Sequence, residues 1–319
     1  MEQSEFIWMN GEVVPWDDAQ VHVLSHALHY GTSVFEGIRC YDTEIGPAVF
    51  RHQDHIDRLI ASGRYYYMDL PFSKEEIREA TLDLIARNGL RSCYIRPIAF
   101  RGYGSMGLFP LEVKVDLSIA VWEWGAYLGE TGKRDGIRAK LSTWKRMSDE
   151  SFHPKAKAGG QYLNSILAKV ESHQGGYDEA IMLDHEGYVS EGSGENIYIV
   201  RDGVVVTPPL GSPILEGVSR DSILAIARDL GVPVEERNIV REELIEAEEV
   251  FLSGTAAELV PVREVDDRPV GSGKPGEVTL QLQSAFEDAL HGRTEKYRDW
   301  LDPVPQELYA ASGPEAGVA

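Results

Sequence analysis

A lysine among small residues is the clearest chemical signal in this sequence. Lys157 lies between two alanines, and Gly159-Gly160 and a predicted helix follow it. Small neighbours leave open space for a flat ring, and the amine of such a lysine can form an imine with a carbonyl substrate or an aldehyde cofactor. Tyr162, in the first turn of the predicted helix, can point its phenol back at this loop. Lys155 is close enough to do the same job.

A glycine-rich acidic turn at residues 190–196 could supply an acid for a ring nitrogen. Its sequence is SEGSGEN, and it lies between two predicted strands. Glycines let a backbone pass close to a ligand. A carboxylate beside a pyridine nitrogen keeps that nitrogen protonated, so that the ring becomes an electron sink. Spacing alone does not choose between Glu191 and Glu195, and a flexible surface turn would have the same composition.

Two short segments could hold an anionic group. Ser219 is predicted to cap a helix, where free backbone N–H groups suit a phosphate. An ordinary capped surface helix explains that segment equally well. Residues 253–257, with the sequence SGTAA, follow a predicted buried strand. The hydroxyls and amides of this turn could bind a phosphate and a carboxylate together.

Two segments place cationic and aromatic side chains on a common face. In the predicted strand over residues 92–101, period two puts Tyr94 and Arg96 on one side. A cation inside an apolar strand is costly unless an anion pairs with it, so Arg96 indicates an anionic ligand or a buried ion pair. The same alternation in the strand-like segment before it puts three more candidates on one face: Phe35, Gly37 and Arg39.

Residues 102–107 contain a literal G-x-G-x-x-G pattern, which would suggest the dinucleotide site of a dehydrogenase. That motif requires a helix at its last glycine, so that the helix N-terminus meets the pyrophosphate. Here Leu108-Phe109-Pro110 follows, and then alternating strand residues. A glycine-rich loop that borders a pocket is the better interpretation.

Length and charge limit the possible partners. The 319 residues suit two domains around a cleft, and the net charge of −21 disfavours nucleic acid and anionic membranes. In so acidic a chain an arginine cluster is informative, because an anionic ligand would need one to bind. The acidic N-terminus does not resemble a signal peptide. Cys40 and Cys93 have no metal-binding spacing and are predicted to be buried, reduced thiols of a cytoplasmic protein.

The predicted elements indicate a mixed α/β (α+β) protein of two domains. The turns Asn10-Gly11 and Asp202-Gly203 predict hairpins, and Ser73 with Glu76 predicts a helix capping box. Later in the chain we expect a strand over residues 137–144 and a helix over 241–247. The expected parts are a small N-terminal domain (1–124), a linker (125–136), a large cofactor-binding domain (137–305) and a disordered tail (306–319).

Six segments, in this order and at this spacing, resemble the branched-chain amino acid aminotransferases of the fold-type IV, pyridoxal-phosphate-dependent class. They are HYGTSVFEGIR at 29–39, YIRP at 94–97, WGAY at 124–127, KAGG at 157–160, SEGSGEN at 190–196 and SGTAAE at 253–258. The resemblance covers residues 5–305. It implies the two-domain fold of that class, with pyridoxal 5′-phosphate as cofactor, an active site between the domains and no metal.

The resemblance also implies a role for each candidate. Lys157 matches the lysine that forms the imine and moves the substrate α-proton, and Glu191 matches the partner of the pyridine nitrogen. Arg96 resembles the residue that takes the side-chain carboxylate of glutamate. The other implied cofactor ligands are Arg58, Tyr162, Val218, Ser219 and Thr255. The implied substrate-binding residues are Tyr30, Phe35, Gly37, Arg39, Tyr94, Arg96, Met106, Leu108, Trp124, Tyr127, Thr255 and Ala256.

The implied reaction is amino transfer between L-leucine, L-isoleucine or L-valine and 2-oxoglutarate, in branched-chain amino acid metabolism. A D-amino acid aminotransferase and an aminodeoxychorismate lyase share this fold and are the alternatives. The resemblance further implies a homodimer or a larger homo-oligomer such as a hexamer, in which the loop with Leu108 reaches a neighbour's site. Its partners would be amino acids and 2-oxo acids, with no nucleic acid and no membrane.

Overall fold

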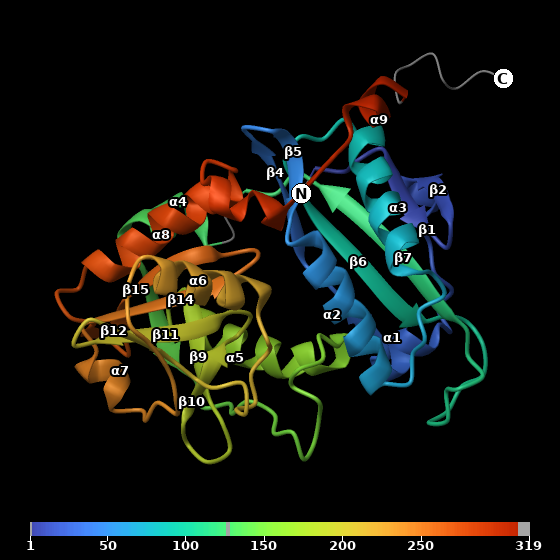
Figure 1. The fold of residues 1–319 in the computed structure, drawn as a ribbon. Helices are drawn as coiled ribbons and strands as arrows, with labels where there is room; N and C mark the ends of the chain where they lie inside the picture. Colours follow the sequence, from blue (N-terminus) through green and yellow to red (C-terminus); the bar gives the residue numbers. More distant parts are fainter. Residues whose placement is uncertain (1, 126–127, 312–319) are drawn as a thin grey trace. The chain divides into compact units, whose positions relative to one another are not determined.

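The computed structural model describes residues 2–125 and 128–311, which form two compact units (Figure 1). The first unit comprises Met1–Trp124, Ala156–Gly160 and Asp288–Ala319. The second comprises Gly125–Lys155 and Gln161–Glu287. Each unit has its own β-sheet with helices packed on it, which confirms the predicted mixed α/β class.

The first unit is built on an antiparallel eight-stranded sheet in the order β17-β5-β4-β6-β7-β1-β2, with β3 paired to β6. Helices α2 (His52–Tyr65) and α3 (Lys74–Arg87) lie along this sheet (Figure 1). Ile56, Ile77 and Ile95 are at most 1 % exposed and form part of its apolar core. The strands are β1 (Phe6–Met9), β2 (Glu12–Pro15), β3 (Ser33–Phe35), β4 (Ile38–Thr43), β5 (Gly46–Phe50), β6 (Cys93–Arg101), β7 (Val115–Trp122) and β17 (Leu301–Pro303). Its remaining α-helices are α1 (His26–Tyr30) and α9 (Gln306–Ala311).

Local sequence signals in this unit are confirmed. Asn10 and Gly11 have φ angles of 52° and 97°, which a primed two-residue hairpin turn requires, and they join β1 to β2. The Ser73 hydroxyl accepts from the Glu76 amide, and the Glu76 carboxylate accepts from the Ser73 amide, so the capping box is complete.

The second unit is built on a mixed nine-stranded sheet in the order β10-β9-β8-β15-β14-β11-β12-β13, with β16 paired to β15. Strand β8 runs parallel to both of its neighbours, β9 and β15. The strands are β8 (Ile137–Leu141), β9 (Glu179–Leu183), β10 (Val189–Gly192), β11 (Asn196–Arg201), β12 (Val204–Thr207), β13 (Val234–Glu236), β14 (Glu249–Gly254), β15 (Glu258–Val265) and β16 (Arg268–Pro269). The α-helices are α4 (Gly129–Asp135), α5 (Tyr162–Gln174), α6 (Val218–Asp229), α7 (Glu243–Glu246) and α8 (Glu277–Leu290).

Several elements differ from expectation. The strand expected to reach residue 144 ends at Leu141, where the Glu171 carboxylate instead accepts from the Thr143 amide and from the Ser142 and Thr143 hydroxyls. The helix expected over 241–247 shortens to α7. The Glu243 carboxylate accepts from the Val240 amide and holds the chain entering this helix. The expected linker contains α4.

The division into units also departs from the expected domains. The segment Ala156–Gly160 belongs to the first unit, because it pairs with β3 through a bridge between Val34 and Ala158. The chain from Asp288 onward also belongs there, because β17 pairs with β5. The tail expected to be disordered from residue 306 begins instead with α9, whose Tyr309 hydroxyl donates to the Leu90 carbonyl at 2.6 Å.

The dinucleotide pattern does not lead into a helix. Strand β6 ends at Arg101, and the described segment 102–114 has turns and bends before β7 begins. The structure therefore supports a loop and gives no support to a dinucleotide site. Among the residues that the structure describes, no helix is long and apolar enough to cross a membrane.

The two cysteines lie directly opposite each other on β4 and β6, although they are 53 positions apart in the sequence (93 − 40). Cys40 and Cys93 are both free and buried, as predicted. A hydrogen bond with the Cys40 side chain and burial together raise the pKa of the Cys93 thiol well above its usual value. Both cysteines therefore behave as small core residues.

Candidate functional site

Backbone hydrogen bonds hold Lys157 in place within the first unit. Its amide donates to the Ser62 hydroxyl at 3.0 Å, and its carbonyl accepts from the Phe35 amide at 3.0 Å. Its side chain is half-buried, with Nζ 5.3 Å from the centroid of the Phe35 ring. The rival, Lys155, lies in the second unit, where its ammonium pairs with Glu216 at 2.9 Å. Lys157 is therefore the lysine that is set among ordered aromatic and polar groups.

The two glycines after Lys157 were expected to leave open space for a flat ring, and the structure gives them a different role. A β-carbon on Gly159 would collide with the Ser33 hydroxyl, and one on Gly160 would lie 3.2 Å from the Gly31 carbonyl oxygen. The absent side chains do not open space for a ring. They let the lysine segment pack backbone to backbone against the chain around β3.

A buried carboxylate organises the residues behind this segment. Glu36 is fully buried and accepts from Arg58 at 2.7 and 2.8 Å and from His55 at 2.8 Å. Burial alone would raise the pKa of Glu36, but the charge and hydrogen bonds of Arg58, together with His55, lower it far below the usual range. Burial lowers the pKa of His55, so His55 is neutral at pH 7 and its Nδ1–H donates to the carboxylate.

This cluster includes two residues that the sequence interpretation missed. Arg58 was expected to bind phosphate, and the structure shows the carboxylate that fixes its guanidinium. Glu36 and His55 were not predicted. The available signal was a glutamate within the otherwise apolar segment around β3, together with His55 and Arg58 one helical turn apart on α2.

The face with Tyr94 and Arg96 forms as predicted. The Arg96 guanidinium donates to the Tyr94 hydroxyl at 3.1 Å and lies 4.8 Å from the centroid of the Phe35 ring and 5.9 Å from that of Trp122. Its Nε is buried without a hydrogen-bond partner, and no carboxylate lies within 4.0 Å of it among the described residues. The structure thus gives no support to the buried ion pair that the sequence also allowed. Trp124 packs edge-on against Tyr94 with ring centroids 4.5 Å apart.

Gly37 and Arg39 flank this face. A β-carbon on Gly37 would collide with the Tyr94 hydroxyl, so only glycine allows the tyrosine this position. Arg39 lies opposite Tyr94 in the β4–β6 pair, and its guanidinium donates to the Trp124 carbonyl at 3.4 Å.

The remaining wall candidates of the first unit have exposed side chains. Tyr30 is 42 % exposed, Met106 is 44 % exposed and Leu108 is 89 % exposed. Tyr127 lies outside the described residues.

In the second unit Glu191 is fixed by three donors. Its carboxylate pairs with Arg146 at 2.7 Å, and it also accepts from the Asn196 amide group at 3.3 Å and from the Leu215 backbone amide at 3.1 Å. Arg146 and Glu191 are both almost fully buried, with side chains 10 % and 5 % exposed. A buried arginine so close to the carboxylate favours its ionised form. Sequence reasoning had not assigned Arg146, because its segment had no recognisable motif.

Three segments of the candidate site meet at Asn196. Its side chain donates to the Leu215 carbonyl at 3.0 Å, its backbone pairs in register with Ser253, and a β-carbon on Gly217 would collide with its side-chain oxygen. The acidic turn, the start of α6 and the turn after β14 therefore lie together. This brings together the predicted Glu191, Val218, Ser219, Thr255 and Ala256.

The start of α6 differs in one detail from the prediction. Gly217 is the N-cap, and Val218 and Ser219 form the first turn. Ser219 is almost fully buried. The first backbone N–H groups of this helix have no intrahelical acceptor, so an anion placed there would meet both these donors and the Ser219 hydroxyl. Tyr162 begins α5 and is half-buried.

Comparison with known proteins agrees with this geometry. The family described as amino-transferase class IV matches residues 33–265. The chain is 50 % identical over 304 residues to the branched-chain-amino-acid aminotransferase of Salmonella typhimurium, covering 95 % of this chain and 98 % of that protein. It is 49 % identical over 306 residues to the enzyme of Escherichia coli K12, covering 96 % and 99 %.

The chain belongs to the class IV aminotransferases. Solved structures agree. The crystal structure of the E. coli branched-chain amino acid aminotransferase has a TM-score of 0.93 at 49 % identity, covering 95 % of this chain and all of that one. The Thermobaculum terrenum enzyme in its PLP-form has a TM-score of 0.89 at 35 % identity, covering 96 % and 100 %. These findings confirm the family resemblance drawn from the six segments.

In a class IV aminotransferase the choice between Glu191 and Glu195 has a physical basis. Burial, and then the charge of Glu179, raise the pKa of Glu195 to about 8. Glu195 accepts from the Gly194 amide, while Glu179 is paired with Lys169. A pKa of about 8 favours the protonated form of Glu195 at pH 7, whereas the Arg146 guanidinium, 2.7 Å away, favours the ionised form of Glu191. Only an anion can keep a ring nitrogen protonated.

The first prediction concerns Glu36. Replacing it in a Glu36→Gln variant removes the charge that compensates buried Arg58, and breaking a buried ion pair from one side costs about 3–5 kcal/mol. We expect a reduction of this size in the free energy of unfolding, measured by urea denaturation. The matched Arg91→Ala variant breaks the exposed Arg91–Asp42 pair and should change stability little. Equal effects of the two variants would contradict the role given to Glu36.

The second prediction concerns the pH dependence of stability. The pKa of Glu195 is 4.5 in the unfolded chain and about 8 in the folded one, so between these values only the folded state holds this proton. The contribution of Glu195 to the free energy of unfolding is greatest below pH 4.5. It falls by up to about 1.4 kcal/mol per pH unit as the pH rises to 8.

A Glu195→Gln variant should flatten this slope between about pH 5 and pH 8 when urea midpoints are measured at several pH values. Glu186→Gln, at an exposed position, should leave the slope as in the parent protein. Parallel pH profiles for the parent and Glu195→Gln would show that Glu195 is already ionised.

Proposed function

We propose that the protein transfers the amino group between L-leucine, L-isoleucine or L-valine and 2-oxoglutarate, with pyridoxal 5′-phosphate as cofactor. One observation supports this most directly. The Phe35 ring lies 5.3 Å from Lys157 Nζ and 4.8 Å from the Arg96 guanidinium. A reactive amine and an anion-binding group therefore share one aromatic wall.

The residues present fit this cofactor. A phosphate would meet the N-terminus of α6 with Val218 and Ser219, and Thr255 lies on the neighbouring turn. Arg58, fixed by Glu36, is the cationic candidate from the first unit. When bound, pyridoxal phosphate supplies an electron sink for a carbanion at the substrate Cα. Glu191, held by Arg146, would keep the ring nitrogen of that group protonated.

Lys157 would act on the proton of the substrate Cα. Its Nζ takes this proton as a general base and returns it at the end of the half-reaction. The backbone bonds to Ser62 and Phe35 keep this residue in place while its four-carbon stem moves. Tyr162, at the start of α5, would bring a phenol to the cofactor.

The same pocket would accept apolar and anionic side chains. Phe35, Tyr94 and Trp124 form a wall on which an aliphatic side chain can pack. Arg96 lies within that wall and has a buried Nε without a partner, so it can bind the second carboxylate of 2-oxoglutarate or glutamate. Tyr94 and the backbone amides of Thr255 and Ala256 would bind the α-carboxylate.

We also propose that the protein works as a homodimer or larger homo-oligomer. Leu163, Ile166, Leu167 and Val170 form a stripe along α5 in which every side chain is at least 44 % exposed. Leu108 and Phe109 are 89 % and 73 % exposed. Exposed apolar stripes of this kind mark association surfaces. In such an assembly the loop with Met106 and Leu108 would contribute to a neighbour's pocket.

The buried free thiols Cys40 and Cys93 support a reducing compartment, and we propose the cytoplasm.

The third prediction tests the central assignment. A Lys157→Ala variant should lose the visible absorption of the lysine–cofactor imine and about 10²–10⁴-fold in turnover of L-leucine, the range for loss of a general base. The control is Lys155→Ala, which removes a lysine two positions away that pairs with Glu216 and should keep both properties. Full turnover in Lys157→Ala, or activity confined to D-alanine, would overturn the proposed function.

The fourth prediction separates the two kinds of substrate. An Arg96→Leu variant keeps an apolar wall and removes the cation. The KM for 2-oxoglutarate should rise about 10–100-fold, as expected for loss of a charged hydrogen bond. The KM for 4-methyl-2-oxopentanoate should change much less, because its side chain needs no cation. Equal increases for both oxo acids would place Arg96 elsewhere than at the side chain of the substrate.

A further inference from the structure

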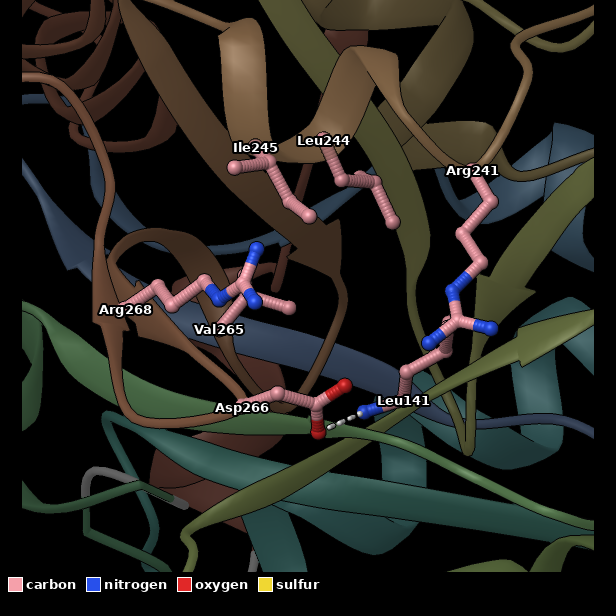
Figure 2. Close-up of a pocket in the computed structure, with 7 residues that line it drawn as sticks. All are labelled: Leu141, Arg241, Leu244, Ile245, Val265, Asp266 and Arg268. Carbon is pink, nitrogen blue, oxygen red and sulfur yellow. Dashed lines mark hydrogen bonds between the residues drawn. The ribbon is translucent and has the colours of Figure 1, made fainter.

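The second unit contains a cavity of about 160 Å³ that shares no residue with the candidate site (Figure 2). It lies between the C-terminal ends of β8 and β15 and the helix α7. Its lining residues are Leu141, Arg241, Leu244, Ile245, Val265, Asp266 and Arg268.

The cavity has an apolar floor. Leu244 and Val265 are 1 % and 3 % exposed and belong to the core of this unit, and Leu141 and Ile245 extend the apolar surface. A cavity of roughly 150 Å³ lined by such side chains is large enough for benzene. The floor can therefore receive a branched aliphatic side chain of three or four carbons.

Among the residues that the structure describes, two arginines at the cavity have no acidic partner. Within the described residues, no carboxylate lies within 4.0 Å of Arg241 or Arg268. Arginines nearby are paired: Arg237 with Glu243 at 2.7 Å, and Arg138 with Glu264 and Asp267. In a chain with a net charge of −21, two unpaired guanidinium groups beside one cavity are a specific feature. They can bind a carboxylate ligand.

An acidic group at the same cavity is held in a fixed position. One oxygen of Asp266 accepts from the Leu141 amide at 3.0 Å, as Figure 2 shows, and the Asp266 amide donates to the Ala139 carbonyl at 3.1 Å. Asp266 and Asp267 have φ angles of 48° and 61°, the turn that joins β15 to β16. The second carboxylate oxygen of Asp266 is thus presented by a rigid turn, where it can accept from a cation.

We propose that this cavity binds the zwitterion of an aliphatic α-amino acid. Arg241 and Arg268 bind its carboxylate, Asp266 binds its ammonium group, and the apolar floor receives its side chain. A phosphate would leave the floor unused and would be repelled by Asp266. The proposal does not depend on transamination, because no lining residue belongs to the proposed catalytic machinery.

The test is equilibrium dialysis of the holoenzyme with labelled L-leucine, after borohydride has reduced the lysine–cofactor imine to an amine, so that leucine cannot form an imine with the cofactor. We expect saturable binding of one leucine per chain. Arg268→Ala and Arg241→Ala should each weaken it about tenfold or more, the effect of one lost charged hydrogen bond. The matched control Arg87→Ala removes an arginine that pairs with Asp83 on α3 and should bind like the parent.

Competition experiments distinguish the ligand class. L-Isoleucine should compete. 4-Methyl-2-oxopentanoate lacks the ammonium group, 3-methylbutylamine lacks the carboxylate, and inorganic phosphate lacks both the ammonium group and the aliphatic side chain, so all three should compete weakly. An Asp266→Asn variant should reduce the preference for L-leucine over the oxo acid, with transaminase activity serving as the check of folding. Equal competition by phosphate or by the oxo acid would overturn the proposal. Binding that survives both arginine substitutions would overturn it as well.

Discussion

The candidate site depends on the backbone packing of the lysine segment against β3. The carbonyl of Lys157 accepts from Phe35, its amide donates to Ser62, and the two following glycines allow the close approach. Because the segment comes from the middle of the chain, this packing is a long-range constraint. It places Lys157, the proposed catalytic residue, in the unit that also contains Tyr94 and Arg96.

The buried carboxylates of the candidate site differ in pKa because their environments differ. Glu36 and Glu191 each accept from a buried or nearly buried arginine, which favours the anion, whereas burial and then the charge of Glu179 raise the pKa of Glu195 to about 8. A chain with 52 acidic residues can thus use a few of them at defined charge states. Burial sets the cost of each charge, and the nearest arginine or carboxylate decides whether that charge is retained.

Features that depend on neighbouring residues were predictable from the sequence, and pairings between distant residues were not. The hairpin at Asn10-Gly11 and the common face of Tyr94 and Arg96 formed as predicted, since each needs only a few adjacent side chains. Arg146 and Glu191 are 45 positions apart (191 − 146), and the sequence around neither residue predicts that the two form an ion pair. The choice of lysine and of ring-nitrogen partner came from the family resemblance. The role of the glycines after the lysine was predicted wrongly. Open space for a ligand and close contact between backbones both require glycine, so the sequence does not distinguish them.

Since Lys157 is held through its own amide and carbonyl, the architecture of the site does not depend on the identity of its side chain. Main-chain bonds form with any residue that tolerates the local φ and ψ angles. Position and reactivity are therefore separable at this residue: a substitution of Lys157 would remove the amine and leave in place the bonds that hold the segment.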